Sequence, residues 1–345
     1  MNNKERTIKR SVFKPFKPLK RKVAIITGIT GQTGSYLAEL LLEKEYYVYG
    51  IVRRTSSGER VERLEHIKND IDIIDGDITD AGCMAKIIGD IKPDELYHCA
   101  AMSFVGVSWN QPTLTFDVNI KGTLNLLEAI RYHSPKTKFV HASSSEMFGS
   151  VLETPQKETT PFNPRSPYGV SKTAAHYITK NYRESFNLFA TNYIAFNHES
   201  KNRGPEFVTR KISIGVAQIY HGLSNELWLG DLKPKRDWSH AKDIVKGAWM
   251  ILQHYKPDDF VLASGETHSV QEFVQKAFSV AGIKNWQKYI KQDKKLIRPA
   301  EVNVLLGDYS KAKKVLGWEP EISFEELVKE MVENDIKLIE RQKSK

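Results

Sequence analysis

Cysteine is scarce in this chain of 345 residues, which contains only Cys83 and Cys99. Two cysteines cannot form the disulfide framework of a small secreted protein, and no cysteine–histidine cluster has the spacing of a zinc site. Long apolar runs are also missing, since no stretch reaches the roughly 18 apolar residues of a membrane span. These absences argue against structural disulfides, a metal site and a membrane span, and we expect a reducing, cytoplasmic setting.

The positive charge is concentrated at one end of the chain. The net charge of +9 would by itself suggest a nucleic-acid partner. Residues 1–20, however, carry seven basic side chains and one acidic one, which is six of the nine net charges. We interpret this segment as a solvated, flexible extension that could touch an acidic partner or a membrane surface. The rest of the chain is nearly balanced, so we expect no nucleic-acid binding.

Beyond the extension, short β-branched segments alternate with helical patterns. The apolar fraction of 40% and the charged fraction of 27% are those of an ordinary globular protein. Strand-like segments recur at residues 23–27, 47–52, 71–74, 95–99, 138–142, 190–195 and 260–263. This alternation predicts an α/β protein with a Rossmann-type, doubly wound parallel sheet covered on both faces.

From about residue 197 the alternation becomes irregular, with more charge and tryptophan. We therefore expect a smaller α/β lobe that closes over the strand ends, where such sheets bind their ligands. The predicted sheet domain comprises residues 21–196 and about 240–265. The predicted smaller lobe comprises residues 197–239 and 266–345.

A glycine-rich turn, Gly28-Ile-Thr-Gly-Gln-Thr-Gly34, joins the first strand to the first helix. Glycines allow the tight turn and let backbone amides approach a pyrophosphate at the helix N-terminus, where the dipole favours anions. Elsewhere in a chain this could be an ordinary turn, but between the first strand and helix it predicts a dinucleotide site. The residues assigned to the cofactor here are Gly28, Thr30, Gly31, Gln32, Thr33 and Gly34.

The end of the second strand predicts which dinucleotide binds. NAD sites usually place an acid there to hold the ribose 2′-hydroxyl, but this chain has Val52-Arg-Arg-Thr-Ser-Ser57. Arginine suits a 2′-phosphate through charge-assisted bonds. Arg53 therefore predicts NADP, although the segment could instead be an exposed basic loop.

A tyrosine and a lysine stand four residues apart in Tyr168-Gly-Val-Ser-Lys172, on one face of a helix. A nearby ammonium group favours the phenolate, so we expect Lys172 to lower the pKa of Tyr168 toward that of a usable general base. The fifth strand ends in Ala142-Ser-Ser-Ser-Glu146, where a serine can hold a substrate oxygen beside the tyrosine. Abstraction of a carbon-bound proton followed by loss of water needs a base and an acid, and Glu146 could supply both. Glu146 could instead be an ordinary surface-loop glutamate.

Together these motifs resemble the extended short-chain dehydrogenase/reductase family, and within it the GDP-mannose 4,6-dehydratase family. The resemblance runs from residue 22 to about residue 339. Its distinctive stretches are residues 28–34, 52–57, 143–149, 168–172, 196–200, 207–211, 235–238 and 298–302.

The resemblance implies a particular reaction. NADP⁺ takes a hydride from sugar C4, assisted by Tyr168, Lys172 and Ser144, and Glu146 then removes the C5 proton. Water leaves from C6 and the hydride returns to C6, giving a 4-keto-6-deoxy sugar. Further cofactor contacts implied by the family pattern are Asp77, Ile78, Ala100, Ala101, Ser103, Tyr168, Lys172, His198 and Arg203. The implied contacts to GDP-mannose are Ser103, Ser144, Glu146, Asn197, Lys211, Arg236, Arg298 and Glu301.

The chain departs from the family pattern at a few positions. Ser144 stands where threonine is common, Thr33 stands where many relatives have aspartate, and residues 104–109 match only some members. These departures leave GDP-manno-heptose open as a second candidate for the sugar. A nucleotide-sugar reductase or epimerase is a competing hypothesis that Glu146 disfavours. A non-catalytic NADP-binding module is a third hypothesis, which the presence of Ser144, Tyr168 and Lys172 disfavours.

The resemblance also implies a homodimer or homotetramer, with residues 53–57 at the tetramer contact. Cofactor binding and assembly would then be coupled. A 4-keto product further implies a downstream reductase or epimerase.

Overall fold

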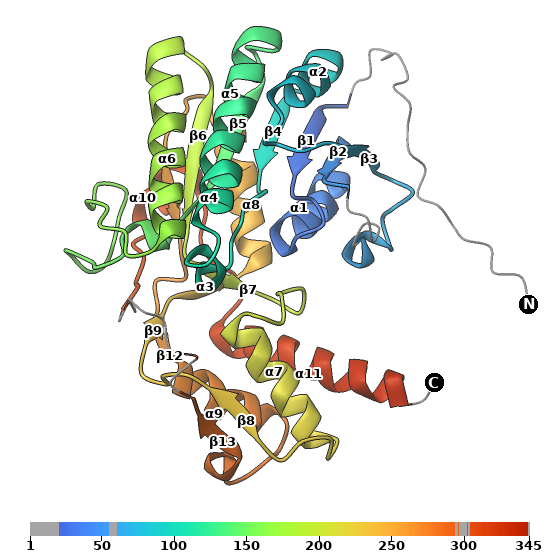
Figure 1. Cartoon of the computed structure of the whole chain (residues 1–345), viewed down its shortest axis with the longest axis vertical. Coiled ribbons are helices and arrows are strands. Elements are labelled where there is room, and N and C mark those ends of the chain that lie inside the picture. Colours follow the sequence, from blue (N-terminus) through green and yellow to red (C-terminus); the bar gives the residue numbers. More distant parts are fainter. Residues whose placement is uncertain (1–20, 55–60, 294–295, 297–301, 303, 344–345) are drawn as a thin grey trace, which may run out of the picture.

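The computed structural model describes residues 21–54, 61–293, 296, 302 and 304–343. The chain forms a larger lobe built on a seven-stranded sheet and a smaller lobe beside the carboxyl ends of the strands (Figure 1). The basic extension 1–20, the loop residues 55–60, Arg298 and Glu301 lie outside the described residues. Within the described part, no helix combines the length and apolar character needed to cross a membrane.

The large sheet confirms the predicted fold class. Its strand order is β11-β6-β5-β4-β1-β2-β3, and every neighbouring pair is parallel. Strands β1, β2 and β11 are nearly continuous apolar runs because both faces of the sheet are covered. Their bounds are β1 (Val23–Thr27), β2 (Tyr47–Val52), β3 (Asp72–Asp75), β4 (Glu95–His98), β5 (Lys138–Ser144), β6 (Ala190–Ala195) and β11 (Phe260–Leu262).

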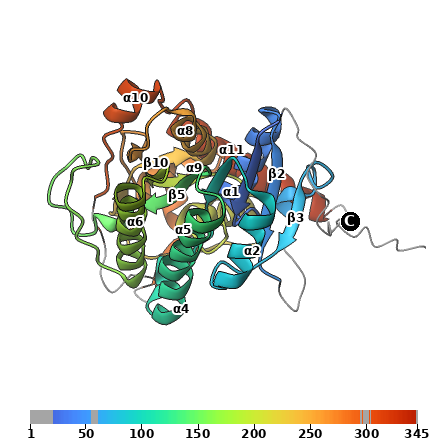
Figure 2. The same ribbon diagram turned by 90° about the horizontal axis from the view of Figure 1, so that it is seen from above.

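Helices cover the two faces of this sheet, as the view from above shows (Figure 2). One face carries α1 (Gln32–Glu43) and α8 (Ala241–Gln253), and the other carries α2 (Ala81–Ile91), α5 (Gly122–His133) and α6 (Pro167–Phe186). Leu37 and Leu41 of α1 are fully buried, and Leu40 is partly buried. In α5, Leu126 and Leu127 are buried, whereas Leu124 is 36% exposed.

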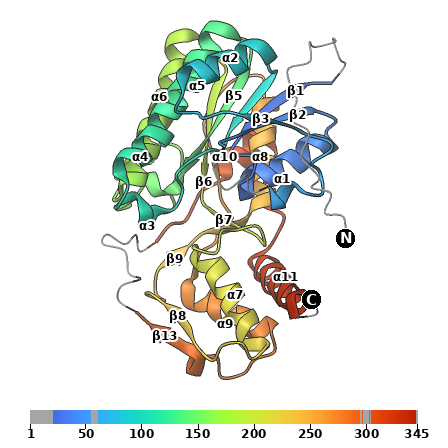
Figure 3. The same ribbon diagram turned by 45° about the vertical axis from the view of Figure 1, so that its right-hand side comes forward.

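The smaller lobe has its own core, separate from that of the sheet (Figure 3). Its helices are α7 (Val208–Tyr220), α9 (Val270–Val280) and α11 (Phe324–Lys343). Trp238, Phe273 and Phe324 pack together in its centre, with ring centroids 5.3 to 6.1 Å apart. Its short strands are β7 (Asn197–Glu199), β8 (Leu227–Leu229), β9 (Lys235–Arg236), β10 (Trp238–His240), β12 (His268–Ser269) and β13 (Ile290–Gln292).

One segment lies elsewhere than the sequence suggests. Helix α10 (Ser310–Leu316) and Trp318 pack with the sheet domain, although residues 266–345 were expected in the smaller lobe. Trp318 is buried and its indole nitrogen donates to the carbonyl of Asp243, 2.9 Å away in α8. The chain therefore packs against the sheet domain again at residues 310–318, before α11 packs in the smaller lobe.

Shorter elements connect these parts. They are α3 (Val105–Ser108), α4 (Pro112–Phe116), the 3₁₀ turns η1 (Glu62–Leu64), η3 (Ser145–Met147) and η4 (Trp286–Tyr289), and the π-helical turn η2 (Asp117–Lys121).

Candidate active site

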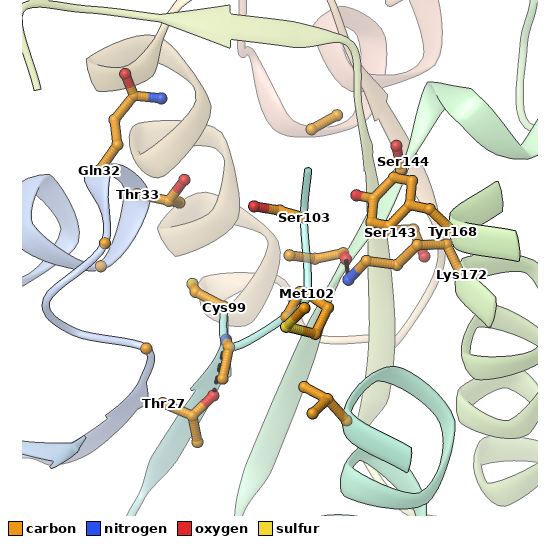
Figure 4. A pocket seen from close by; sticks show the side chains of 18 of the residues that line it. Thr27, Gln32, Thr33, Cys99, Met102, Ser103, Ser143, Ser144, Tyr168 and Lys172 are labelled. Atoms are coloured by element: carbon orange, nitrogen blue, oxygen red, sulfur yellow. Dashed lines mark hydrogen bonds between the residues drawn. The ribbon is translucent and has the colours of Figure 1, made fainter. Parts of the chain in front are cut away.

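A cavity of about 680 Å³ lies at the carboxyl ends of β1, β4, β5 and β6 (Figure 4). This is the edge where parallel α/β sheets bind their ligands. The cavity is lined by all the predicted cofactor and catalytic residues and by Asn197. Residues of the sheet domain therefore meet residues of the smaller lobe around one space.

Two of the predicted substrate residues that the structure describes are not among those lining the cavity. Lys211 lies on α7 and Arg236 on β9, both in the smaller lobe. Arg236 is 7% exposed, and its Nη1 donates to the carbonyl of Lys235 at 2.9 Å. Arg298 and Glu301 lie outside the described residues. No group of three or more His, Cys, Asp or Glu in the described ranges could hold a metal ion.

The glycine turn forms one wall of the cavity. Gly28 has a φ of +70°, and a Cβ there would lie 2.8 Å from the backbone of Ala100. A Cβ on Gly34 would lie 2.3 Å from the carbonyl oxygen of Gly28. Only glycine fits both positions, because the turn must pass close to the β4 loop before α1 begins. Gly31 is the N-cap of α1 and supplies no side-chain cap, so the first amides of α1 are not covered by a capping side chain.

Tyr168 and Lys172 are positioned by the start of α6. Ser166 caps this helix by accepting from the amide of Gly169 at 3.0 Å, and Pro167 occupies its first turn. Tyr168 and Lys172 are then one helical turn apart and 8% and 3% exposed. The ammonium group of Lys172 donates to the carbonyl of Ala142 at 2.8 Å, and Tyr168 lies beside Ser144 (Figure 4).

Ser144 and Glu146 come from the end of β5. The Ser144 hydroxyl caps η3 by accepting from the amide of Glu146 at 3.2 Å. Glu146 is 8% exposed and lines the cavity, so it is not an ordinary surface-loop glutamate.

Burial dominates the electrostatics of the Tyr–Lys pair. It raises the pKa of Tyr168 to about 12, and the opposing contributions of the Ser144 hydrogen bond and the Arg203 charge are smaller. It also lowers the pKa of Lys172 to about 8. The predicted lowering of the Tyr168 pKa is therefore wrong for the free protein, because desolvation penalises the phenolate more than the nearby positive charge stabilises it.

Asn119 is a structural residue of the site that sequence patterns did not reveal. It lies in the π-helical turn η2 and is 1% exposed. Its side-chain oxygen accepts from the amide of Met102 at 2.9 Å, and its nitrogen donates to the Ser171 hydroxyl at 2.9 Å. Asn119 thereby fixes the loop after β4 against the helix that carries Tyr168 and Lys172. Such π turns are frequent at functional sites.

Side chains of the glycine turn also bind the smaller lobe. Gln32 donates to the carbonyl of His198 at 2.9 Å and accepts from the Ser200 hydroxyl at 2.7 Å. The Thr33 hydroxyl lies 2.8 Å from Nε2 of His198. The turn is thus connected directly to the segment that follows β6.

These features define a class of protein. A parallel sheet with a glycine turn after β1, and a buried Tyr–Lys pair on the helix after β5, are the features of the extended short-chain dehydrogenase/reductases. The UDP-glucose 4-epimerase of Thermus thermophilus, solved in complex with NAD, has the same fold. Its TM-score is 0.79 at 25% identity, and the match covers 91% of this chain and 98% of the epimerase.

Within this class, a family model for GDP-mannose 4,6 dehydratase matches residues 25–331, and the chain belongs to that family. The relative named GDP-mannose 4,6 dehydratase 2 of Arabidopsis thaliana is 51% identical over 335 residues, covering 94% of this chain and 89% of the relative. The relative named GDP-mannose 4,6 dehydratase of Homo sapiens is 49% identical, covering 92% of each chain.

Four histidines have strongly shifted pKa values, and one of them, His198, lines the cavity. Burial lowers the pKa of His98 to about 3 and that of His176 and His198 to about 4, and it lowers the pKa of His141 well below its ordinary value. The contacts of His98 agree with a neutral ring. Thr123 donates its hydroxyl proton to a backbone carbonyl, so Nε2 of His98 must donate to Thr123, 3.1 Å away. Both ring nitrogens of His141 are buried without a protein partner among the described residues.

We expect stability to fall in mild acid because of these histidines. The unfolded chain protonates near the ordinary pKa of 6.5, whereas the folded chain resists protonation down to about pH 4. The free energy of unfolding should decrease by ~1.4 kcal/mol per pH unit for each fully affected histidine in this window. Urea denaturation from pH 7.5 to pH 4.5 measures the slope.

His141→Leu isolates one of these groups. Leucine fills a similar volume and removes two buried polar atoms that lack protein partners among the described residues, so the variant should fold. Its free energy of unfolding should depend less steeply on pH, by the contribution of one histidine. An unchanged slope in His141→Leu would contradict this assignment.

Proposed function

We propose that the chain is a GDP-mannose 4,6-dehydratase that uses NADP. The observation that carries this proposal is the presence of Glu146 in one cavity with Ser144, Tyr168 and Lys172. Oxidation at an alcohol needs only the last three, whereas elimination of water also needs a carboxylate. The names of the Arabidopsis and human relatives supply the sugar and the nucleotide.

The cavity is suited to a nicotinamide dinucleotide. The N-terminus of α1, capped only by the backbone of Gly31, lies in its wall and suits a pyrophosphate. Arg53 follows β2, lines the cavity and is exposed, which suits an adenosine 2′-phosphate. When bound, the cofactor supplies a hydride acceptor, later a hydride donor, and a positive charge close to Tyr168.

In the first half of the reaction, Tyr168 takes the proton of the sugar C4 hydroxyl as the C4 hydride departs. Ser144 forms a hydrogen bond to the same oxygen, and the ammonium group of Lys172 supplies positive charge one helical turn from Tyr168. The pKa of Tyr168 is about 12 even though Arg203 of the smaller lobe lowers it, so the phenolate would also need the positive charge that a bound cofactor supplies.

In the second half, the new C4 ketone acidifies the C5 proton, which Glu146 removes. The C6 hydroxyl leaves as water after it takes a proton, and Glu146 is placed to deliver it. The hydride then returns to C6, and C5 takes a proton that balances the one Tyr168 took from the C4 hydroxyl, which gives the 4-keto-6-deoxy sugar. No net oxidation occurs, so the cofactor ends in the state in which it began.

In this proposal the two lobes bind different parts of the ligands. The sheet domain, residues 21–196 and about 240–265, holds the cofactor, and the smaller lobe brings Lys211 and Arg236 to the GDP portion. Arg298 and Glu301 are assigned to the same portion from the family pattern. We also expect a homodimer or homotetramer in the cytoplasm and a downstream reductase or epimerase that consumes the 4-keto product.

Incubation of the purified protein with GDP-mannose, without added reductant, tests the reaction directly. We expect the sugar nucleotide to lose one water by mass spectrometry, with no net reduced cofactor. Glu146→Gln should lower the rate on the order of 10²–10⁴-fold, since the amide cannot accept the C5 proton. Glu184→Gln, on an exposed part of α6, is the control and should keep the wild-type rate.

Two outcomes would count against this proposal. Full turnover by Glu146→Gln to a sugar nucleotide that has not lost water would favour a reductase or epimerase, which needs no elimination. If GDP-manno-heptose loses water and GDP-mannose does not, the mechanism stands but the substrate is the heptose.

The cofactor preference follows from Arg53. Arg53→Asp should weaken NADP binding by about 10- to 100-fold, because a charge-assisted bond to the 2′-phosphate becomes a repulsion. Arg341→Asp makes the same change in charge at an exposed residue of α11, which does not line the cavity, and should have little effect. Calorimetric titration with NADP and NAD measures both, and equal NADP affinity in the two variants would contradict the role of Arg53.

A further inference from the structure

Two phenylalanine rings connect the lobes beside the cavity. Phe104 ends the loop after β4 that carries Ala100, Ala101 and Ser103, whereas Phe207 is the N-cap of α7 in the smaller lobe. Their centroids are 5.5 Å apart and their planes meet at 75°, an edge-to-face contact. Phe207 also lines the cavity. This aromatic pair thus joins the predicted cofactor loop to the opposite lobe.

Both rings are held in place by their surroundings. The ring of Phe104 lies against Gly106, where a Cβ would be only 3.2 Å from it. The guanidinium carbon of Arg203, a cavity residue of the smaller lobe, lies 3.5 Å from the centroid of Phe207. Phe207 therefore contacts Phe104 and Arg203 at once, and its position depends on both.

Arg203 is itself anchored in the smaller lobe. Its Nε lies 3.0 Å from a carboxylate oxygen of Glu199, which is 2% exposed and accepts from the Thr209 hydroxyl at 2.6 Å. The charge of Arg203 reaches across the cavity, since it opposes the effect of burial on the pKa of Tyr168. The aromatic contact and the catalytic tyrosine are thus connected through one cation.

We propose that Phe104 and Phe207 form a gate that retains the oxidised sugar and the reduced cofactor between the two hydride transfers. This inference rests on the proposed function, because only a reaction with an internal return of hydride needs such retention. The contact is modest in strength, so it can open to admit and release the sugar nucleotide.

The intermediate at risk has a definite composition. After C4 loses a hydride to the cofactor and a proton to Tyr168, and C5–C6 loses water, the sugar lacks two hydrogens and one water. Normal turnover restores the hydride at C6 and a proton at C5, so that the product lacks water alone. Escape at this stage would leave one reduced cofactor for each escaped sugar.

The experiment measures the ratio of these two sugar products, together with reduced-cofactor fluorescence, in the full-length enzyme given GDP-mannose. In Phe104→Ala and Phe207→Leu, the fraction of sugar that lacks both water and two hydrogens should rise by about tenfold or more, with matching reduced cofactor. Phe104→Tyr keeps the edge-to-face ring and should retain the wild-type ratio. Phe186→Ala, at the far end of α6, is the control for loss of a partly exposed phenylalanine.

The outcomes separate the gate from a structural role and from the proposed function. A lower total rate in Phe104→Ala and Phe207→Leu, with the wild-type ratio of products, would overturn the gate and leave the dehydratase intact. Absence of dehydrated sugar from the wild-type enzyme would overturn the proposed function, and the gate with it.

Discussion

Desolvation at the carboxyl edge of the sheet is the constraint on which the site depends. Tyr168 and Lys172 lie one helical turn apart and are almost fully buried, and burial opposes the charged form of each. Tyr168 consequently stays a phenol in the free protein. Arg203, from a lobe whose core is separate from that of the sheet, lowers this pKa but does not offset the effect of burial. The electrostatics of the tyrosine therefore depend on both lobes.

Two sets of contacts bring the lobes together at this edge. Gln32 and Thr33 bind His198 and Ser200, and Phe104 meets Phe207 beside the cavity. Both sets begin on loops assigned to the cofactor, so its binding would act directly on the smaller lobe. Water exclusion strengthens electrostatic interactions inside the site and protects a reactive intermediate.

The sequence allowed most of the sheet and the cavity residues to be predicted, because β-branched runs and glycine spacing depend on local backbone geometry. The strand predicted at 190–195 agrees with β6 to the residue. Properties set by packing were not accessible in this way. The π turn at Asn119 and the packing of Trp318 against the sheet domain depend on distant neighbours. The direction of the Tyr168 pKa failed for the same reason, since helical spacing reveals a nearby cation but not the extent of burial.

The central claim is that the hydride removed from C4 returns to C6 within one closed site. Incubation with GDP-mannose deuterated at C4, followed by NMR of the sugar product, tests it most directly. We expect one deuterium at C6 of every product molecule, even in the presence of excess unlabelled reduced cofactor. Product without deuterium at C6, or labelled cofactor accumulating in solution, would contradict it.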